Sequence, residues 1–164
     1  MSNPSSARWA LRPPTGDDAA FLDRLFRDTT GAPVAAYGAL PDGGAHLLAA
    51  MRRGQERAWR EAYGAEGERL VLLGDAPVGR LWTARVGAHE LRLVDLGLIA
   101  SARGQGLGAE VLAHVVAAAH AEGRTVVLHV APDNPAQRLY ARHGFVEVGR
   151  DPMNVRLERA PGAR

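Results

Sequence analysis

Residues 103–108 read Arg-Gly-Gln-Gly-Leu-Gly, and their types and spacing suit the binding of a phosphate group. They follow an apolar run that ends at Ile99, which predicts a buried strand, and they precede a strongly periodic helical segment. Glycines let the backbone approach an anion closely and tolerate positive φ. The first turn of a helix adds unpaired N–H groups and a partial positive charge. The stretch therefore predicts an anion site, to which Arg103 can add a full charge.

Two common phosphate-binding motifs do not fit this turn. A Walker loop ends in Gly-Lys-Ser or Gly-Lys-Thr, and the sequence contains no lysine. The dinucleotide fingerprint needs Gly-x-Gly-x-x-Gly and an acidic residue about 20 positions later. Here Gly104, Gly106 and Gly108 alternate, and Leu128-His129 stands where the acid is expected. A nucleotide-binding domain is therefore a weak alternative.

A second stretch downstream carries a recognisable pattern: residues 134–145 read Asn-Pro-Ala-Gln-Arg-Leu-Tyr-Ala-Arg-His-Gly-Phe. The Arg-x-x-Gly-x-Gly pattern after a strand resembles the pyrophosphate-binding motif of the GNAT superfamily, the acyl-CoA-dependent N-acetyltransferases. The second stretch looks like that superfamily's Asn…Leu-Tyr-x-x-x-Gly-Phe segment. Both occur in the right order, and the chain is similar to the small, single-domain bacterial members.

The resemblance implies an N-acetyltransferase that moves an acetyl group from acetyl-CoA, as cosubstrate, directly to a primary amine of a small molecule or peptide. In the superfamily, the strand before the turn splays from its neighbour and pairs with the pantetheine arm. Asn134 lies six residues before Tyr140, and Asp133 at the seven-residue spacing is the alternative. The implied cofactor-binding residues are Leu98, Ile99, Arg103, Gly104, Gln105, Gly106, Leu107, Gly108 and Asn134.

Two residues are candidates for proton transfer. Tyr140 matches the tyrosine that superfamily members often use as general acid, and a phenol suits the protonation of a thiolate; the alternative is a packing role. Counting by twos along its strand places Asp95 on a largely buried face, where a raised pKa would make it a proton acceptor. A structural Asp95 is equally compatible with the pattern. Glu90, expected on the opposite face, and bulk water are the alternative bases.

Composition narrows the remaining functions. No residue is cysteine, all basic side chains are arginine, and the net charge is +2. The six histidines lack metal-ligand spacing, so no metal is expected. The sequence lacks the stripe of basic and aromatic residues that would indicate nucleic-acid binding. No apolar run approaches the roughly 20 residues that cross a bilayer. These features favour a cytoplasmic protein, for which a homodimer would be unsurprising. A non-catalytic acyl-CoA-binding sensor or regulatory module is the alternative function.

The elements that must position these residues form a single α/β domain over residues 8–158, with flexible ends at 1–7 and 159–164. The resemblance implies a mixed, mostly antiparallel sheet of six or seven strands with about four flanking helices. Strands are expected at 9–12, 69–73, 78–86, 91–99, 125–130, 145–148 and 153–157. Helices are expected at 18–27, 46–63, 106–122 and 134–144, and a loop at 31–44. The second helix should pack through a stripe made of Leu47, Leu48, Met51, Gln55, Trp59 and Tyr63.

Overall fold

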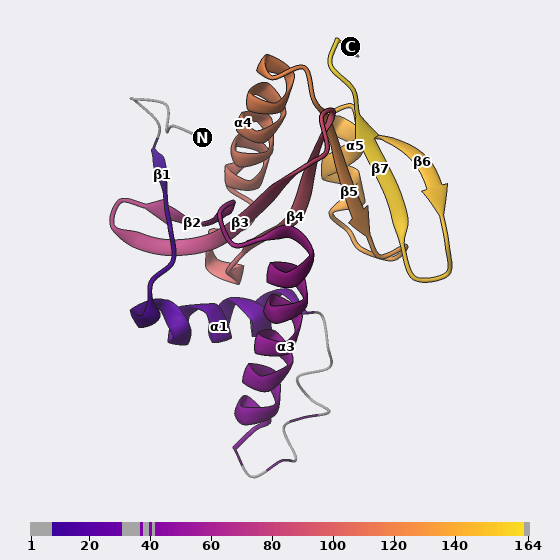
Figure 1. The fold of residues 1–164 in the computed structure, drawn as a ribbon. Helices are drawn as coiled ribbons and strands as arrows, with labels where there is room; N and C mark the ends of the chain where they lie inside the picture. Colours follow the sequence, from indigo (N-terminus) through magenta and orange to yellow (C-terminus); the bar gives the residue numbers. More distant parts are fainter. Residues whose placement is uncertain (1–7, 31–36, 38–39, 41, 163–164) are drawn as a thin grey trace. The chain divides into compact units, whose positions relative to one another are not determined.

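The structure, a computed structural model, describes residues 8–30, 37, 40 and 42–162. Seven strands form one sheet in the order β1-β2-β3-β4-β5-β7-β6 (Figure 1). β4 and β5 run parallel, whereas the pairs β1–β2, β5–β7 and β6–β7 are antiparallel. The predicted α/β class, with a mostly antiparallel sheet and about four helices, is confirmed. The predicted flexible start at 1–7 lies outside the described residues, as does most of the predicted loop at 31–44, whereas only residues 163–164 of the predicted tail at 159–164 do.

The chain forms two compact units. The C-terminal unit contains residues 82–95 and 104–162, and the N-terminal unit contains the described residues up to Leu81 together with 96–103. β3 and β4 therefore each contribute residues to both units. Among the described residues, no helix combines the length and the apolar composition needed to cross a membrane.

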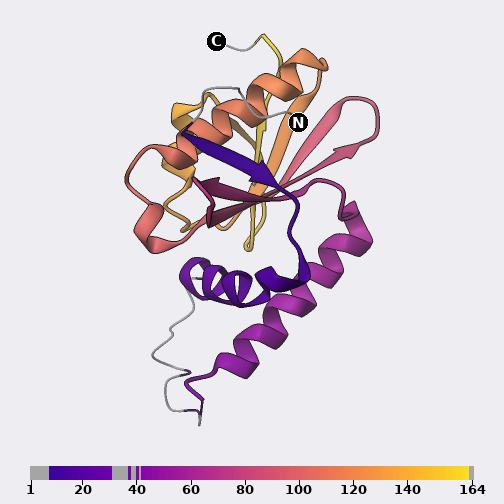
Figure 2. The same ribbon diagram turned by 90° about the vertical axis from the view of Figure 1, so that its left-hand side faces the viewer.

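In the N-terminal unit, α1 and α3 contact each other beside the first strands (Figures 1 and 2). α1 buries the apolar side chains of Leu22, Leu25 and Phe26. Arg12 forms a bidentate ion pair with Asp18 just before this helix, with both N–O distances at 2.7 Å. The elements are β1 (Trp9–Arg12), a 3-10 turn (Gly16–Asp18), α1 (Ala19–Thr29), α3 (Ala45–Tyr63), β2 (Glu68–Leu73) and β3 (Ala76–Val86).

The predicted packing stripe of α3 is confirmed at Leu48 but wrong at Leu47 and Met51. Leu47 and Met51 are 42% and 40% exposed, whereas Leu48, Arg52 and Glu56 are buried. These three residues follow the i, i+4, i+8 spacing of one helix face. The predicted stripe contained no charged residue, but Arg52 and Glu56 are buried because they pair with each other and with opposite charges on other elements.

The C-terminal unit packs α4 against its strands. α4 buries Leu107, Val111, Leu112, Val115 and Ala119, as the periodicity predicts, and Gly123 follows its end with φ 68°. β4 ends one residue before the predicted Ile99, and β7 extends to Arg159, a position expected in the tail. The elements are β4 (Glu90–Leu98), α4 (Leu107–Ala121), β5 (Thr125–Val130), α5 (Gln137–Arg142), β6 (Val146–Arg150) and β7 (Val155–Arg159).

Candidate active site

β4 and β5 are paired over only part of their length. Their ladder joins Glu90–Arg92 to Thr125–Val127, although β4 continues to Leu98 and β5 to Val130. Within the C-terminal unit, the described register leaves residues 93–95 and 128–130 outside this ladder. β5 stays paired with β7 on its other edge as far as Val130. The parting leaves strand edges with which an extended ligand can form backbone hydrogen bonds.

The glycine-rich turn before α4 is exposed at residues 103–106. Gly104 has φ 74° and Gly106, the N-cap residue, has φ 80°, angles that other L residues rarely adopt. A Cβ on Gly104 would meet no atom within 4 Å, so this position requires the backbone angle rather than the space. The Glu110 N–H donates to Gly106 O. The N–H groups of residues 107–109 therefore precede the first hydrogen bond within the helix. The start of α4 therefore offers donors and a positive dipole to an anion.

The other turn residues differ in exposure. Leu107 is 1% exposed and anchors the first turn of α4 in the core, whereas Gln105 is exposed. Gly108 is half-buried within that first turn. The turn thus combines an apolar anchor with accessible backbone.

Arg103 makes contacts that its sequence position did not suggest. Its Nε donates to Leu98 O at 2.9 Å, and its Nη2 donates to Asp28 O at the end of α1 at 2.7 Å. Asp28 Oδ2 also accepts the Ala100 N–H at 3.0 Å. Arg103 therefore ties the end of α1 to the end of β4 inside the N-terminal unit, and two of its three guanidinium nitrogens serve this purpose.

Leu98 and Ile99 are both buried, at 9% and 5% exposed. Ile99 N–H donates to Val78 O at 2.9 Å, and Ile99 O accepts the Ala102 N–H at 3.0 Å. Leu98 O accepts from Arg103, as described above. These three backbone groups are therefore engaged within the protein. A cofactor at this strand end would have to pair with other backbone groups of the segment.

Tyr140 lies on α5 and is 8% exposed. Its ring contacts Phe145 edge to face at a centroid distance of 5.7 Å. Gly144 permits this contact because its φ of 74° reverses the chain after α5, so that Phe145 N–H donates to Tyr140 O. Burial and the negative charge of Asp95 raise the pKa of the Tyr140 hydroxyl to about 12. At neutral pH the phenol is therefore protonated and can donate, but not accept, a catalytic proton.

The two candidate bases lie on opposite faces of β4. Leu91 and Leu93 are buried and alternate with Glu90, while Asp95 on the leucine face is only half-buried, less than predicted. Glu90 Oε1 accepts from Arg92 Nε at 2.7 Å. The charge of Glu90 is thus compensated by Arg92. The charge of Asp95, in contrast, helps to raise the pKa of Tyr140.

Asn134 acts locally as a turn residue. Its Oδ1 accepts the Ala136 N–H at 2.9 Å, and its backbone oxygen accepts the Gln137 N–H at 3.2 Å. The helix α5 starts only at Gln137, three residues later than predicted. Asp133 is exposed, as is Asn134. Asn134 Oδ1 is therefore engaged in a turn before α5, whose N-cap residue is Ala136.

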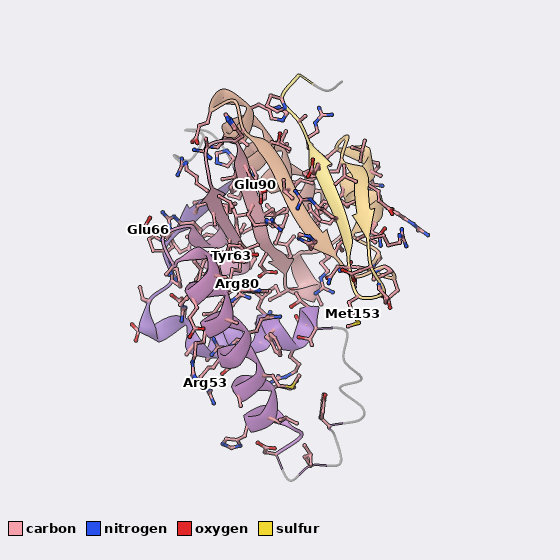
Figure 3. All side chains as sticks on the ribbon, turned by 45° about the vertical axis from the view of Figure 1, so that its right-hand side comes forward. Arg53, Tyr63, Glu66, Arg80, Glu90 and Met153 are labelled. Atoms are coloured by element: carbon pink, nitrogen blue, oxygen red, sulfur yellow. The ribbon has the colours of Figure 1, made fainter. Side chains whose placement is uncertain are left out.

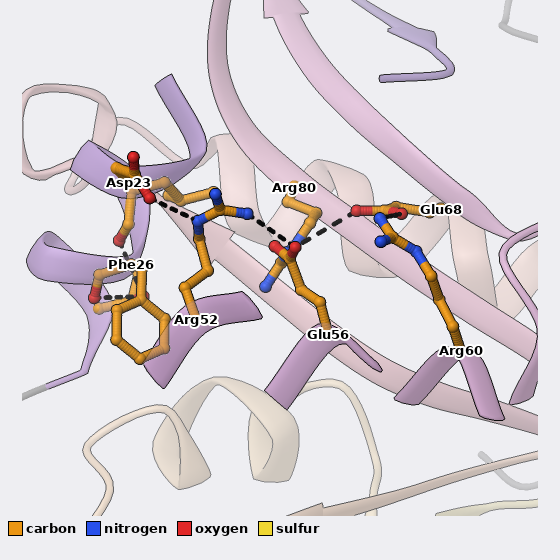
Figure 4. Close-up of polar contacts among 9 residues, drawn as sticks. Asp23, Phe26, Arg52, Glu56, Arg60, Glu68 and Arg80 are labelled. Atoms are coloured by element: carbon orange, nitrogen blue, oxygen red, sulfur yellow. Dashed lines mark hydrogen bonds and ion pairs between the residues drawn. The ribbon is translucent and has the colours of Figure 1, made fainter. Parts of the chain in front are cut away.

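Sequence reasoning missed a buried ionic cluster in the N-terminal unit, made of Arg52, Glu56, Glu68 and Arg80 (Figure 4). The Glu56 carboxylate accepts from Arg52 at 2.7 Å and from Arg80 at 2.6 Å. Glu68 lies 3.7 Å from Arg80. The cluster continues outward to Asp23 and Arg60 at 2.7 and 3.1 Å. The available signal was the i, i+4 pair on α3 together with charged residues inside apolar strand patterns.

Residues of α3 line a hollow of about 410 Å³, and Arg53, one of them, is labelled in Figure 3. Its lining side chains are all charged: Arg53, Glu56, Arg57, Arg60 and Glu61. None of these residues was predicted to belong to the site.

His129 on β5 is a further residue that the sequence did not assign to the site. It is exposed, and its Nδ1 lies 2.5 Å from Nη1 of Arg92 on β4. The contact with Arg92 depends on the β4–β5 register, which sequence patterns do not provide.

Comparison with known proteins places these features in a family. The model of the acetyltransferase (GNAT) family matches residues 41–145. The fold is similar to that of PH1933 from Pyrococcus horikoshii, with 18% identity, a TM-score of 0.73, and 94% of this chain and 99% of the other covered. An acetyltransferase from Thermus thermophilus is 25% identical with a TM-score of 0.67, over 93% and 96% of the two chains.

A plant structure is also similar in fold. Naa50 from Arabidopsis thaliana, in complex with the bisubstrate analogue CoA-Ac-MVNAL, is 17% identical with a TM-score of 0.61, over 94% of this chain and 99% of the other. The comparison with curated proteins gives no match.

Proposed function

Because the chain belongs to the acetyltransferase (GNAT) family, we propose that it transfers an acetyl group from acetyl-CoA directly to the primary amine of a small molecule or peptide. The observation that carries the proposal is the parting of β4 from β5 beyond Arg92, in the unit that also holds the glycine-rich start of α4. The complex of Naa50 with a bisubstrate analogue supports the pairing of coenzyme A with an amine-bearing acceptor in this fold.

The backbone of residues 104–109 would hold the pyrophosphate. Two glycines with positive φ and the N–H groups of residues 107–109 would supply donors without a side chain in the way. Arg103 would contribute mainly by fixing the end of β4, because its guanidinium already donates to Leu98 and Asp28. The pantetheine arm would form backbone hydrogen bonds with residues 93–95 of β4 and 128–130 of β5, which lie beyond the ladder between the two strands.

Tyr140 would act as the general acid. The amine nitrogen attacks the thioester carbonyl carbon, a C–N bond forms, and the C–S bond breaks. The departing thiolate then takes the phenolic proton, and the proton lost by the amine passes to Asp95 or to water. A protonated phenol in a buried setting supports the first role, and the half-buried carboxylate beside it supports the second. Asp95 or water would finally restore the phenolic proton.

Calorimetric titration with acetyl-CoA, ATP and NAD, followed by measurement of thiol release with a panel of amines, tests the proposal. We expect 1:1 binding of acetyl-CoA alone and thiol release that depends on an amine. Binding without thiol release would favour the non-catalytic sensor or regulatory module. Absence of binding would mean that the glycine-rich turn is only a turn. Asp95→Asn should slow turnover, and full activity in that variant would leave water as the proton acceptor.

A further inference from the structure

Three nitrogen-bearing side chains form a row across one face of the C-terminal unit. Arg92 is paired in register with Val127 on β5, His129 lies two residues further along β5 on the same face, and Arg156 on β7 is directly opposite His129. Glu90, labelled in Figure 3, and Glu158 flank the row: Arg156 Nη2 lies 2.7 Å from Glu158 Oε1 and 3.9 Å from Glu90 Oε2. The row crosses the sheet next to the point where β4 and β5 part.

The contact between Arg92 and His129 determines which nitrogen of His129 carries the hydrogen. Arg92 Nη1 lies 2.5 Å from His129 Nδ1. A guanidinium donates hydrogen bonds and cannot accept them, so Nδ1 must be the unprotonated nitrogen. In a neutral imidazole the hydrogen is then on Nε2. Arg92 therefore fixes His129 as a hydrogen-bond donor at Nε2 and engages the one lone pair with which it could act as a base.

Burial and the surrounding charges favour the neutral form of this imidazole. Burial lowers the pKa of His129, and the nearby charges of Arg92 and Arg156 lower it further. Glu90 and Asp151 oppose this effect without reversing it. Since His129 is exposed and Nε2 has no hydrogen-bond partner among the described residues, an N–H donor is presented at the surface of the sheet.

We propose that the His129 Nε2–H, together with the partly exposed guanidinium of Arg156, binds an oxygen atom that the acceptor carries next to its amine. This inference rests on the proposed acetyl transfer and specifies its acceptor. The preferred acceptors are compounds whose amine lies beside a carbonyl or carboxylate, as in amino acids and peptide N-termini, rather than simple alkylamines. His129 positions the acceptor, and Arg92 holds His129 in the donating form.

Three acceptors with the same side chain distinguish the sources of that oxygen: an amino acid, its carboxamide and the corresponding alkylamine. Thiol release at saturating acetyl-CoA gives kcat and KM for each. His129→Ala should raise KM for the two oxygen-bearing acceptors by roughly tenfold, the loss expected for one hydrogen bond, and leave the alkylamine unchanged. A larger effect on the amino acid than on the carboxamide would identify a carboxylate, and equal effects would identify a carbonyl. The KM for acetyl-CoA should stay the same.

His129→Gln is the matched variant because glutamine keeps an N–H donor but cannot take up a proton at this pH. Its KM for the oxygen-bearing acceptors should stay close to that of the wild type. A His129→Gln variant as impaired in kcat as His129→Ala, with a changed pH profile, would instead make His129 a base and overturn the proposal.

Nitrogen NMR of the wild-type protein provides a readout that does not depend on activity. At pH 7, His129 should be a neutral imidazole with its hydrogen on Nε2, and Arg92→Leu should remove this preference. A cationic ring or a hydrogen on Nδ1 would overturn the proposal. Equal efficiency with alkylamines and amino acids would overturn the acceptor assignment alone, whereas absence of thiol release with every amine would reject the acetyl transfer and this inference with it.

Discussion

The buried ionic cluster of the N-terminal unit and the polar residues around the parting of β4 and β5 use polar chemistry in opposite ways. In the cluster, Arg52, Glu56, Glu68 and Arg80 are each less than 7% exposed and lie next to opposite charges within the protein. Around the parting, Tyr140 is buried and protonated, and His129 presents a donor. Burial alone therefore does not separate structural from functional polar groups; what separates them is whether the protein itself uses their hydrogen-bonding capacity.

The difference has a physical basis. A buried charge is tolerated when its partners compensate for lost hydration, and removal of one partner leaves the others exposed to the full desolvation penalty. A group that is to act on a ligand must keep a donor or acceptor available until the ligand arrives. The cluster should therefore control stability, whereas the residues around the parting should control turnover and selectivity.

The largest effect is expected from Glu56→Ala. This change leaves Arg52 and Arg80 buried beside fewer negative charges and should lower the free energy of unfolding by about 3–5 kcal/mol. Glu61→Ala is the control, because this exposed residue lies on the same helix and should change stability by less than about 0.5 kcal/mol. Chemical denaturation measures both. A loss below about 1 kcal/mol in Glu56→Ala would mean that the cluster does not stabilise the unit.

Tyr140→Phe, in contrast to Glu56→Ala, should affect turnover much more than stability. Removal of one buried hydroxyl should change stability little, while turnover should fall by roughly 100-fold or more because the thiolate loses its proton donor. The dissociation constant for acetyl-CoA should be nearly unchanged. Tyr63→Phe on α3 serves as the matched control and should keep full turnover. Unchanged turnover in Tyr140→Phe would remove the acid role and leave the contact with Phe145 as the function of this residue.

Alanine variants of two glycines with similar backbone angles distinguish the effect of backbone strain from an effect on cofactor binding. Gly104 and Gly123 have φ 74° and 68°, and a Cβ on either would meet no atom within 4 Å. Alanine at either position should cost about 1 kcal/mol of stability through strain. Only Gly104→Ala should also weaken acetyl-CoA binding, because only Gly104 lies in the turn before α4. Equal affinities of the two variants, measured by calorimetry, would argue against phosphate binding at this turn.

Much of the fold could be predicted because local signals agree with one another. The α4 periodicity, Gly123 after its end and the β-branched run of β5 each indicate one structure, and the observed elements follow them closely. α3 was harder to predict because its buried face carries Arg52 and Glu56, which pair with each other and with Asp23 and Arg80 on other elements. Periodicity assigns such residues to solvent, since it contains no information on distant partners.

The candidate site shows the same limit. The glycines and Tyr140 were found because their spacing is local and similar to a family pattern, and these roles stay predictions until they are tested. The contacts of Arg103 with Asp28 and of His129 with Arg92 join residues 75 and 37 positions apart. No local pattern in the sequence specifies such contacts, although they determine which nitrogens stay available to a ligand.

The smallest effect is expected at Asp18, an ion pair near the surface of the N-terminal unit. Hydrogen bonds from Arg12 hold the pKa of the Asp18 carboxyl well below its ordinary value, and Thr15 N–H adds to this effect. The pair therefore contributes fully above the ordinary carboxyl pKa of about 4, and its contribution is lost as the pH falls toward the lower folded pKa. Asp18→Asn should cost about 1 kcal/mol at pH 7, since Arg12 is partly exposed, and this difference from wild type should shrink on acidification. Thermal unfolding between pH 7 and 2 measures the difference, with the exposed neighbour Asp17→Asn as control. A difference that stays constant with pH would show that the ion pair does not contribute to the acid sensitivity of this unit.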